Sequence, residues 1–427
     1  MSLPSSLAAS AVRSLLLLPL RHRQLTALAI MASFLVFRFG PLSTGVGCSS
    51  LVAIAALWRF ARHRRVSPVL RGRLRRQLVF ARTWATTADR VRLTSADGVY
   101  RTRLGKVRST ALADQIWLRL APGQTPETVA SACEPLRHIF GAERISCEET
   151  GPGRVLLTVY HADPLAKAVA SAPLSDSVDL SAIPLGITES GDPFTLRLAG
   201  SHVLVAGCSG SGKSSLLWGL IRALTPAIRS RTVSLWVIDP KGGVELGTGQ
   251  PLFARYADTD ADFMAELLDE AVDAMRARAA KLRGLARVHV ATVEMPLMVV
   301  LIDELAALVA YCPDQALRKR MTSALHLLLT QGRAAGVVVV GAVQDPRKET
   351  VPFRDLFTVR VALRLVEPEA AYLVLGDGAR ERGAACDRIS VSTPGVGYVR
   401  ADDRAGVTRV RVAYVSDADI AALVRTV

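Results

Sequence analysis

The sequence predicts an α/β fold built on a parallel sheet, preceded by a small α+β module and an apolar N-terminal segment. Several short runs of apolar residues, many of them β-branched, end in polar side chains, as buried strands of parallel sheets do. One such run leads into a glycine-rich loop and a helix. Before residue 60 two apolar stretches lie beside arginines. The length of 427 residues allows two or more domains with sizeable cores.

The basic charge of the chain is concentrated at its N-terminus. The formal net charge is +15, and the hydrophobic fraction of 50% excludes a disordered chain. The first acidic residue is Asp89, and the 88 residues before it contain 13 arginines and no lysine. The charge therefore does not by itself indicate a nucleic-acid partner, because a basic flank of a membrane segment gives the same total.

The six cysteines are scattered, with no close pair and no histidine at metal-ligand spacing. This pattern favours a reduced, cytosol-facing chain over a disulfide framework or a zinc site. The cysteines are Cys48, Cys133, Cys147, Cys208, Cys312 and Cys386.

Two apolar stretches, residues 25–37 and 42–58, predict a membrane anchor. Each is slightly short of the ~20 residues that cross a bilayer, and together they are too long for one straight span. We expect a transmembrane helical hairpin over 25–58, with the turn at Gly40 and Pro41 and with residues 1–24 in the cytoplasm. A single span is the alternative. Either way the protein is expected in the cell membrane with its main domain in the cytoplasm.

Residues 59–110 are expected to be an arginine-rich juxtamembrane linker. Nine arginines and no acid occur from Arg59 to Arg82. A segment next to a membrane anchor meets anionic lipid first, so contact with cytoplasmic membrane lipids is favoured over contact with DNA.

Residues 111–165 predict the small α+β domain. Alternating patterns indicate strands over 115–120, 144–149 and 154–160, and a helical period covers 127–140. Residues 166–192 are expected to be a linker, and residues 193–427 the larger domain.

The strongest chemical signal is a phosphate-binding loop. A buried-strand run at 202–206 is followed by GCSGSGKS and then by a helical pattern, which is the required context of this motif. Backbone N–H groups and the helix N-terminus would bind the phosphates of ATP, Lys213 would reach the β- and γ-phosphates, and the Ser214 hydroxyl would bind Mg²⁺. The predicted nucleotide-binding residues are Gly207, Cys208, Ser209, Gly210, Ser211, Gly212, Lys213, Ser214 and Ser215.

A second phosphate-site element follows the apolar run 297–302. Asp303 and Glu304 come directly after it, which places them at the carboxyl edge of a central strand, where open α/β sheets bind ligands. Asp303 is expected to hold Mg²⁺, and Glu304 to act as general base toward the attacking water.

Two further catalytic candidates flank the apolar run 337–343. Gln344 follows it and would sense the γ-phosphate or position the water, although a solvated strand end is the alternative. Arg333 precedes it and is a candidate arginine finger if subunits form a ring, or else a surface arginine at a helix end.

The segment Asp239-Pro-Lys-Gly-Gly-Val-Glu245 follows another apolar strand. Its proline and two glycines indicate a tight exposed loop, and the residues alone indicate only a turn that carries a mobile lysine.

This segment, together with the glycine-rich loop, the Asp303-Glu304 pair and Gly332-Arg-Ala-Ala-Gly336, resembles the FtsK/SpoIIIE family of DNA-pumping ATPases. The resemblance covers about residues 193–398. Residues 343–348 and 353–357 look more like the actinomycete plasmid-transfer (Tra-type) FtsK-like membrane proteins. One departure is Asp345, which stands where better-known members carry an arginine.

The resemblance implies a RecA-like P-loop NTPase core, assembly as a homo-hexamer around double-stranded DNA, and an N-terminal membrane anchor. The expected function is thus ATP-driven translocation of double-stranded DNA at the membrane, for plasmid conjugation or DNA partition. The alternatives are a secretion-type ATPase that moves a protein substrate, and a tethered DNA organiser with a degenerate ATPase. The candidate DNA contacts are the basic runs Arg347-Lys348 and Arg318-Lys-Arg320, and a solvated surface is the alternative for each.

Overall fold

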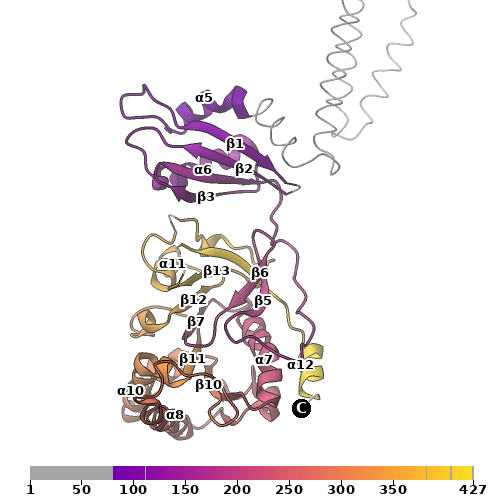
Figure 1. Ribbon diagram of the computed structural model, residues 1–427, viewed down its shortest axis with the longest axis vertical. Helices are drawn as coiled ribbons and strands as arrows, with labels where there is room; N and C mark the ends of the chain where they lie inside the picture. The colour runs from indigo at the N-terminus through magenta and orange to yellow at the C-terminus, as the bar shows by residue number, and fades with distance from the viewer. Residues whose placement is uncertain (1–79, 111, 381, 404–405, 426–427) are drawn as a thin grey trace, which may run out of the picture. The chain divides into compact units, whose positions relative to one another are not determined.

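The computed structural model describes residues 80–110, 112–380, 382–403 and 406–425 (Figure 1). The predicted cytoplasmic N-terminus at 1–24, the transmembrane hairpin at 25–58 and most of the arginine-rich stretch lie outside these residues. Within the described part of the chain, no helix combines the length and the apolar character that crossing a bilayer requires.

The N-terminal part contains a four-stranded sheet with the strand order β1-β2-β4-β3. The elements are α5 (Ala81–Arg90), β1 (Arg103–Ser109), β2 (Ala113–Arg119), α6 (Pro126–Phe140), β3 (Arg144–Gly151) and β4 (Arg154–Tyr160). The predicted helix and three strands are confirmed. Strand β1 was not predicted, because only two of its seven residues, Val107 and Ser109, are buried and its apolar alternation is correspondingly weak.

The larger domain is organised around a ten-stranded sheet with the order β6-β5-β14-β13-β12-β7-β11-β10-β8-β9. The strands from β12 to β9 in this order are parallel, and the remaining pairs are antiparallel. The strands are β5 (Ile183–Thr188), β6 (Pro193–Leu196), β7 (Val203–Ala206), β8 (Val233–Ile238), β9 (Arg255–Ala257), β10 (Leu297–Ile302), β11 (Val337–Val343), β12 (Val359–Ala362), β13 (Val396–Ala401) and β14 (Thr408–Val412).

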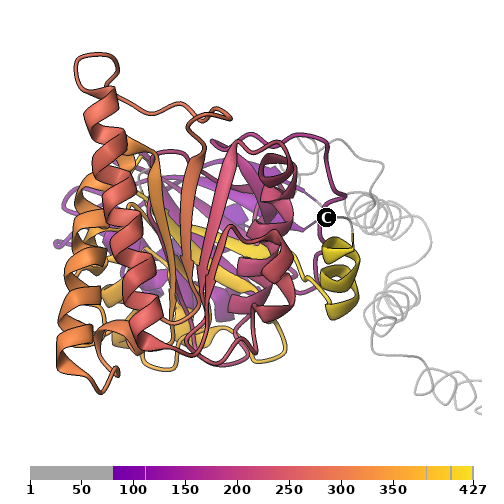
Figure 2. The ribbon, with the colours of Figure 1, turned by 90° about the horizontal axis from the view of Figure 1, so that it is seen from below.

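Helices cover both faces of this sheet, and Figure 2 shows α8 and α10 on one side and α7 on the other. The first face carries α8 (Ala261–Leu282), α9 (Leu305–Val309), α10 (Gln315–Gln331) and α11 (Pro368–Leu375), and the second carries α7 (Lys213–Arg229) and α12 (Asp417–Val424). Every residue of β7, β10 and β11 is buried as a result, which explains why these strands read as continuous apolar runs. Four short 3₁₀ helices complete the domain: η2 (Gly247–Leu252), η3 (Gly332–Ala335), η4 (Arg354–Leu356) and η5 (Cys386–Arg388).

The parallel register brings the carboxyl ends of four strands to one edge. Ile302 of β10 pairs with Ile238 of β8 and Gly341 of β11, and Val343 of β11 pairs with Ala206 of β7. The loops that follow β7, β8, β10 and β11 therefore converge. Part of the segment expected to be a linker, residues 166–192, is strand β5 of this sheet.

Candidate nucleotide-binding site

The glycine-rich loop joins β7 to α7, as predicted. Its last residue, Gly212, is the N-cap of α7 and has a φ of +101°, and Gly210 has a φ of +68°. Both lie in the left-handed region that glycine adopts without a steric penalty. The first N–H groups of α7 have no intrahelical partner, so together with the helix dipole they form an anion-binding end.

Close backbone packing shapes this loop. A Cβ on Gly212 would lie 2.5 Å from the backbone nitrogen of Gly395, and a Cβ on Gly207 would lie 2.4 Å from Ser211 Oγ. The Ser211 hydroxyl is buried and has no hydrogen-bond partner among the described residues. The glycines that line the cavity and the free N–H groups at the start of α7 fit a phosphate group.

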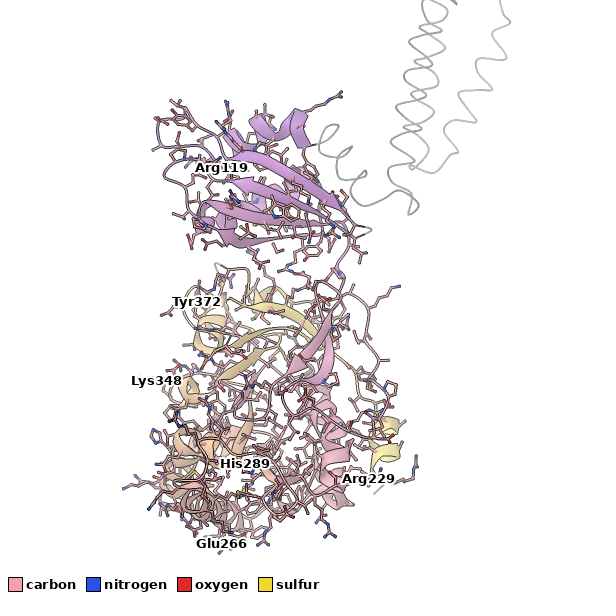
Figure 3. The ribbon with its side chains drawn as sticks, in the orientation of Figure 1. Arg119, Arg229, Glu266, His289, Lys348 and Tyr372 are labelled. Carbon is pink, nitrogen blue, oxygen red and sulfur yellow. The ribbon has the colours of Figure 1, made fainter. Side chains whose placement is uncertain are left out.

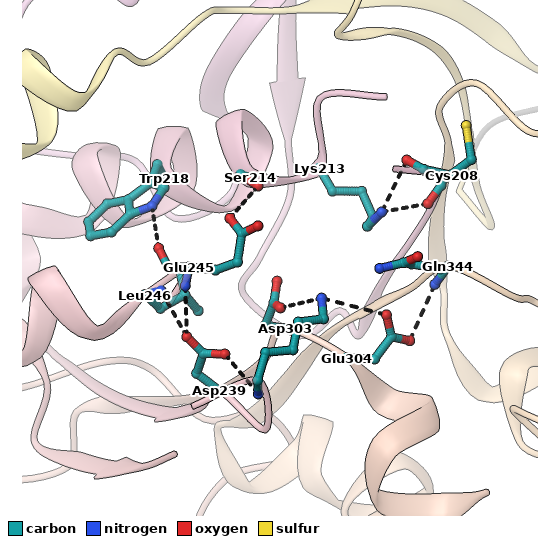
Figure 4. Close-up of polar contacts among 12 residues, drawn as sticks. Cys208, Lys213, Ser214, Trp218, Asp239, Glu245, Leu246, Asp303, Glu304 and Gln344 are labelled. Carbon is teal, nitrogen blue, oxygen red and sulfur yellow. Dashed lines mark hydrogen bonds and ion pairs between the residues drawn. The ribbon is translucent and has the colours of Figure 1, made fainter. Parts of the chain in front are cut away.

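Lys213 is the first residue of α7, and its side chain folds back over the loop (Figure 4). Its Nζ donates to the carbonyl oxygens of Gly207 at 2.5 Å and Cys208 at 3.2 Å. Burial lowers the pKa of this ammonium, and the nearby Glu304 carboxylate opposes that effect. The lysine is therefore desolvated and held at the mouth of the loop that would bind phosphate.

The acidic pair follows β10 directly, as predicted. The Asp303 side chain is 3% exposed and that of Glu304 is 10% exposed. Glu304 Oε1 accepts the backbone N–H of Gln344 at 3.3 Å, so the ends of β10 and β11 are joined here. Burial raises the pKa of both carboxyls, and the Lys241 charge offsets this only in part.

The loop after β8 contributes a cation that the sequence did not assign to the site. Lys241 Nζ lies 2.6 Å from Asp303 Oδ2 and 3.7 Å from Glu304 Oε2. Burial acts to lower the pKa of Lys241, but the hydrogen bond and charge of Asp303, with Glu304 adding to them, outweigh burial and raise it. The ion pair favours the charged form of both partners. Burial nevertheless has the larger effect on the pKa of Asp303, because the Asp303 side chain is 3% exposed and the Lys241 side chain is 33% exposed.

Asp239 holds this loop in shape. It is fully buried, and Oδ2 accepts the backbone N–H groups of Glu245 at 3.2 Å and Leu246 at 2.9 Å. Gly242 and Gly243, which lie between Asp239 and Glu245, have φ of +73° and +74°. These two residues bend the chain back toward the sheet edge. The segment read from the sequence as an exposed turn with a mobile lysine is thus a fixed loop.

The same loop brings Glu245 to the phosphate loop. Glu245 Oε2 accepts the Ser214 hydroxyl at 2.6 Å, and the Glu245 carbonyl accepts Trp218 Nε1 at 3.1 Å (Figure 4). Glu245 was missed as a site residue. Its only sequence signal was its place at the end of the Asp-Pro-Lys-Gly-Gly segment.

A cavity of about 300 Å³ runs along these groups. Its lining residues include Ser209, Gly210, Gly212, Lys213, Ser214, Ser215, Lys241, Glu245, Asp303 and Gln344. The described part of the chain has no group of three or more His, Cys, Asp or Glu side chains that could hold a metal alone. Ser214 and Asp303 would instead share Mg²⁺ with phosphate oxygens and water, as this ion prefers.

Arg333 is not part of this cavity. It lies in η3, just before β11, and its Nε donates to Gly200 O at 2.9 Å. Gln344 follows the same strand at its other end, and the seven residues of β11 separate the two by about 20 Å at ~3.3 Å per residue. Arg333 therefore lies at the edge of the sheet opposite its own phosphate loop.

The fold and the site define a P-loop NTPase with a doubly covered, mostly parallel sheet. A sequence model of the FtsK/SpoIIIE family matches residues 164–388, and the chain belongs to this family. A second model, described as the actinomycete conjugal transfer protein N-terminal domain, matches residues 64–161.

Among known proteins, the chain is 29% identical to the transfer protein TraSA of Streptomyces ambofaciens over 72% of this chain and 78% of that protein. It is 28% identical to the DNA translocase FtsK of Staphylococcus aureus over 47% of this chain, and that match spans only 27% of the FtsK protein. Among solved structures, the monomer of the pCW3 conjugation coupling protein TcpA with ATPγS matches 80% of this chain and 97% of that chain, with 21% identity and a TM-score of 0.54. This structural likeness shows the shared fold.

Proposed function

We propose that this protein is a membrane-anchored, ATP-driven translocase of double-stranded DNA that serves conjugative plasmid transfer. The observation that carries the proposal is one cavity in which the phosphate loop, Lys213 and Asp303 meet, with Glu304 directly beside Asp303. This cavity lies in an FtsK/SpoIIIE domain, and a conjugal-transfer N-terminal domain precedes that domain in the same chain.

Different residues of the cavity would bind different parts of Mg²⁺–ATP. The N–H groups at the start of α7 and the Lys213 ammonium would hold the phosphates, and Ser214 and Asp303 would hold Mg²⁺. When bound, Mg²⁺ would neutralise negative charge on the β- and γ-phosphate oxygens. The Ser214 hydroxyl now donates to Glu245, so it would turn from that carboxylate to the ion.

Glu304 is the proposed general base. Its pKa is raised by burial, which makes the carboxylate a stronger proton acceptor than a solvated one. The Gln344 N–H donates to Oε1 and orients the carboxylate. The Gln344 side chain lines the cavity, which suits its proposed role beside the γ-phosphate.

A ring of subunits is the proposed active form. Because Arg333 lies at the far edge of the sheet, it can reach a phosphate loop only on another copy of the chain. Assembly as a homo-hexamer around double-stranded DNA would meet that need. We further propose that residues 25–58 anchor the ring in the cell membrane, that the arginines at 59–82 contact lipid, and that the motor domain lies in the cytoplasm.

The test uses the full-length protein in lipid nanodiscs and measures ATP hydrolysis with double-stranded DNA, single-stranded DNA or neither. We expect double-stranded DNA to stimulate hydrolysis, Lys213→Ala to abolish it, and the protein to displace the third strand of a DNA triplex in an ATP-dependent manner. Hydrolysis that is indifferent to DNA, without triplex displacement, would overturn the proposal and favour a protein substrate.

A further inference from the structure

The cavity at the phosphate loop also has a wall that the phosphate chemistry does not use. This wall is formed by Ala168, Pro394, Gly395, Arg411, Val412 and Tyr414. Ala168 lies in the segment before β5 and the other five lie at or after Pro394, and sequence reasoning assigned none of them to the site.

The wall is fixed to the phosphate loop by backbone contacts. The Gly395 N–H donates to Ser211 O at 2.8 Å, and the Val412 N–H donates to Gly395 O at 2.8 Å. The Tyr414 N–H donates to Val169 O at 2.8 Å, which ties the end of the wall to the segment before β5. The wall therefore stays in register with the phosphate loop.

The side chains of the wall suit a nucleoside. Ala168, Pro394 and Val412 are apolar, and the large side chain of Tyr414 at the rim is 60% exposed. Arg411 is 4% exposed and one of its N–H groups donates to Leu165 O at 2.6 Å. An exposed aromatic ring beside an apolar surface offers a stacking platform to any base, since every base has a π-face.

We propose that the base and ribose of the bound nucleotide lie against this wall of the cavity, with the base stacked on Tyr414. The inference rests on the proposed function, because it assigns the rest of the nucleotide whose phosphates bind at the loop. A triphosphate held at the N-terminus of α7 uses the phosphate loop, so its nucleoside must lie against other residues of the same cavity, and the wall supplies them.

A second cavity, of about 270 Å³, also borders the phosphate loop and provides an internal comparison. It is lined by Cys208, Ser209, Gln344 and Val366 among others, and none of the described residues that line it is aromatic. Val366 is 76% exposed, so its side chain can be replaced with little effect on packing. Substitutions of Tyr414 and of Val366 can therefore report which of the two cavities binds the nucleoside.

The experiment measures the affinity of the full-length protein, without DNA, for ATP and for inorganic tripolyphosphate by calorimetry. Tripolyphosphate reports on the phosphate loop, and the difference between the two ligands reports on the nucleoside. Loss of one stacking partner typically costs roughly ten- to a hundredfold in affinity. We expect Tyr414→Ala to lose ATP affinity by about tenfold or more while tripolyphosphate binding stays unchanged. Tyr414→Phe should bind ATP as the unmodified protein does.

The matched control is Val366→Ala, which should leave both affinities unchanged. An unchanged ATP affinity in Tyr414→Ala, an equal loss of both ligands, or a selective loss of ATP in Val366→Ala would overturn the assignment. Photolabelling with 8-azido-ATP gives a readout on the unmodified chain, and the label should fall on the tryptic peptide with Tyr414 rather than on that with Val366. A protein that binds neither ligand would contradict the proposed function itself.

Discussion

The Lys241 ammonium lies between two carboxylates, 2.6 Å from Asp303 Oδ2 and 3.7 Å from Glu304 Oε2. Burial raises the pKa of Glu304, and Lys241 is the largest effect that lowers it again. The cation thus keeps the proposed general base ionised at a lower pH than burial alone would allow. The loop that follows β8 thereby lowers the pKa of a carboxyl that follows β10, against the larger effect of burial.

Removal of this charge should change the pH dependence of hydrolysis. In Lys241→Met the pKa of Glu304 rises further, so the carboxyl is protonated over a wider acidic range. We expect the acidic limb of the kcat profile to move to higher pH, while Lys241→Arg keeps it near its original position. A steady-state titration of ATPase activity between pH 5 and pH 9 checks this, and an unmoved limb in Lys241→Met would mean that the lysine does not control the base.

Replacement of Glu304, the proposed general base, should separate ATP binding from hydrolysis. Glu304→Gln keeps an oxygen that can accept the Gln344 N–H but cannot take a proton from water. General-base catalysis typically contributes about 10²–10⁴-fold, so we expect kcat to fall by at least about a hundredfold. ATP affinity should change less than about threefold, because the proposed role of Glu304 is to accept a proton from the attacking water and not to bind the phosphates. Single-turnover hydrolysis and calorimetry measure the two quantities, and a kcat above a tenth of the original would contradict the role.

The two glycines after Lys241 provide a matched pair. Both have positive φ, but a Cβ on Gly242 would meet no atom within 4 Å, whereas a Cβ on Gly243 would lie 2.6 Å from the Tyr256 hydroxyl oxygen. Gly242→Ala should cost about 1 kcal/mol of unfolding free energy from the left-handed backbone alone and keep most of the ATPase activity. Gly243→Ala should cost more and lose most of the activity, because the loop that carries Lys241 and Glu245 must move.

A second substitution tests whether the clash is the cause. Tyr256→Phe removes the nearest atom that the new methyl group would meet and leaves Asp258 Oδ2 at 3.2 Å, so Gly243→Ala with Tyr256→Phe should recover most of the lost stability and activity without reaching the level of Gly242→Ala. Urea unfolding and ATPase rates measure both effects. The idea fails if Gly243→Ala behaves like Gly242→Ala, or if the double variant is no better than the single one.

The sequence predicted the parts of this site that depend on local order. Asp303 and Glu304 were placed correctly because a buried strand runs straight to its polar end, and the phosphate loop because its glycines act within one turn. Lys241 and Glu245 were not predicted as site residues, because their contacts depend on the bend that Gly242 and Gly243 introduce. Contacts across the sheet cannot be read from a local pattern until the strand order is known.

Contacts between distant strands also explain why the sequence did not predict the wall of the cavity at Gly395 or the full extent of the sheet. Gly395 reaches Ser211 only because β13 lies near β7 in the sheet order, with β12 between them. Strand β5 was assigned to a linker, because just two of its six residues, Ile183 and Leu185, are buried and they give no continuous apolar run.

The two candidate DNA contacts at 347–348 differ in whether an acidic side chain is paired with them. The Arg347 guanidinium pairs with Asp345 at 2.5 Å, whereas Lys348 is an exposed side chain labelled in Figure 3. The acid at position 345 neutralises the arginine, so Lys348 should supply more of the phosphate binding. The slope of log K against log salt falls in magnitude by about 0.9 for each DNA phosphate that a protein cation no longer neutralises. We therefore expect a larger fall in slope for Lys348→Ala than for Arg347→Ala, and equal slopes in both variants and the parent would exclude this loop from the DNA interface.

The position of Arg333 predicts complementation between two inactive variants. The Arg333→Ala variant keeps its phosphate loop but lacks the proposed arginine finger. The Lys213→Ala variant keeps Arg333 but lacks the phosphate-loop lysine. Because each subunit's Arg333 lies at the sheet edge opposite its own loop, a mixed ring contains interfaces where the finger of a Lys213→Ala subunit meets the intact loop of an Arg333→Ala subunit. Mixtures should regain DNA-stimulated ATPase activity, with a maximum near equal amounts, although each variant alone is inactive. Activity that stays at the level of the separate variants at every ratio would show that Arg333 does not act across an interface.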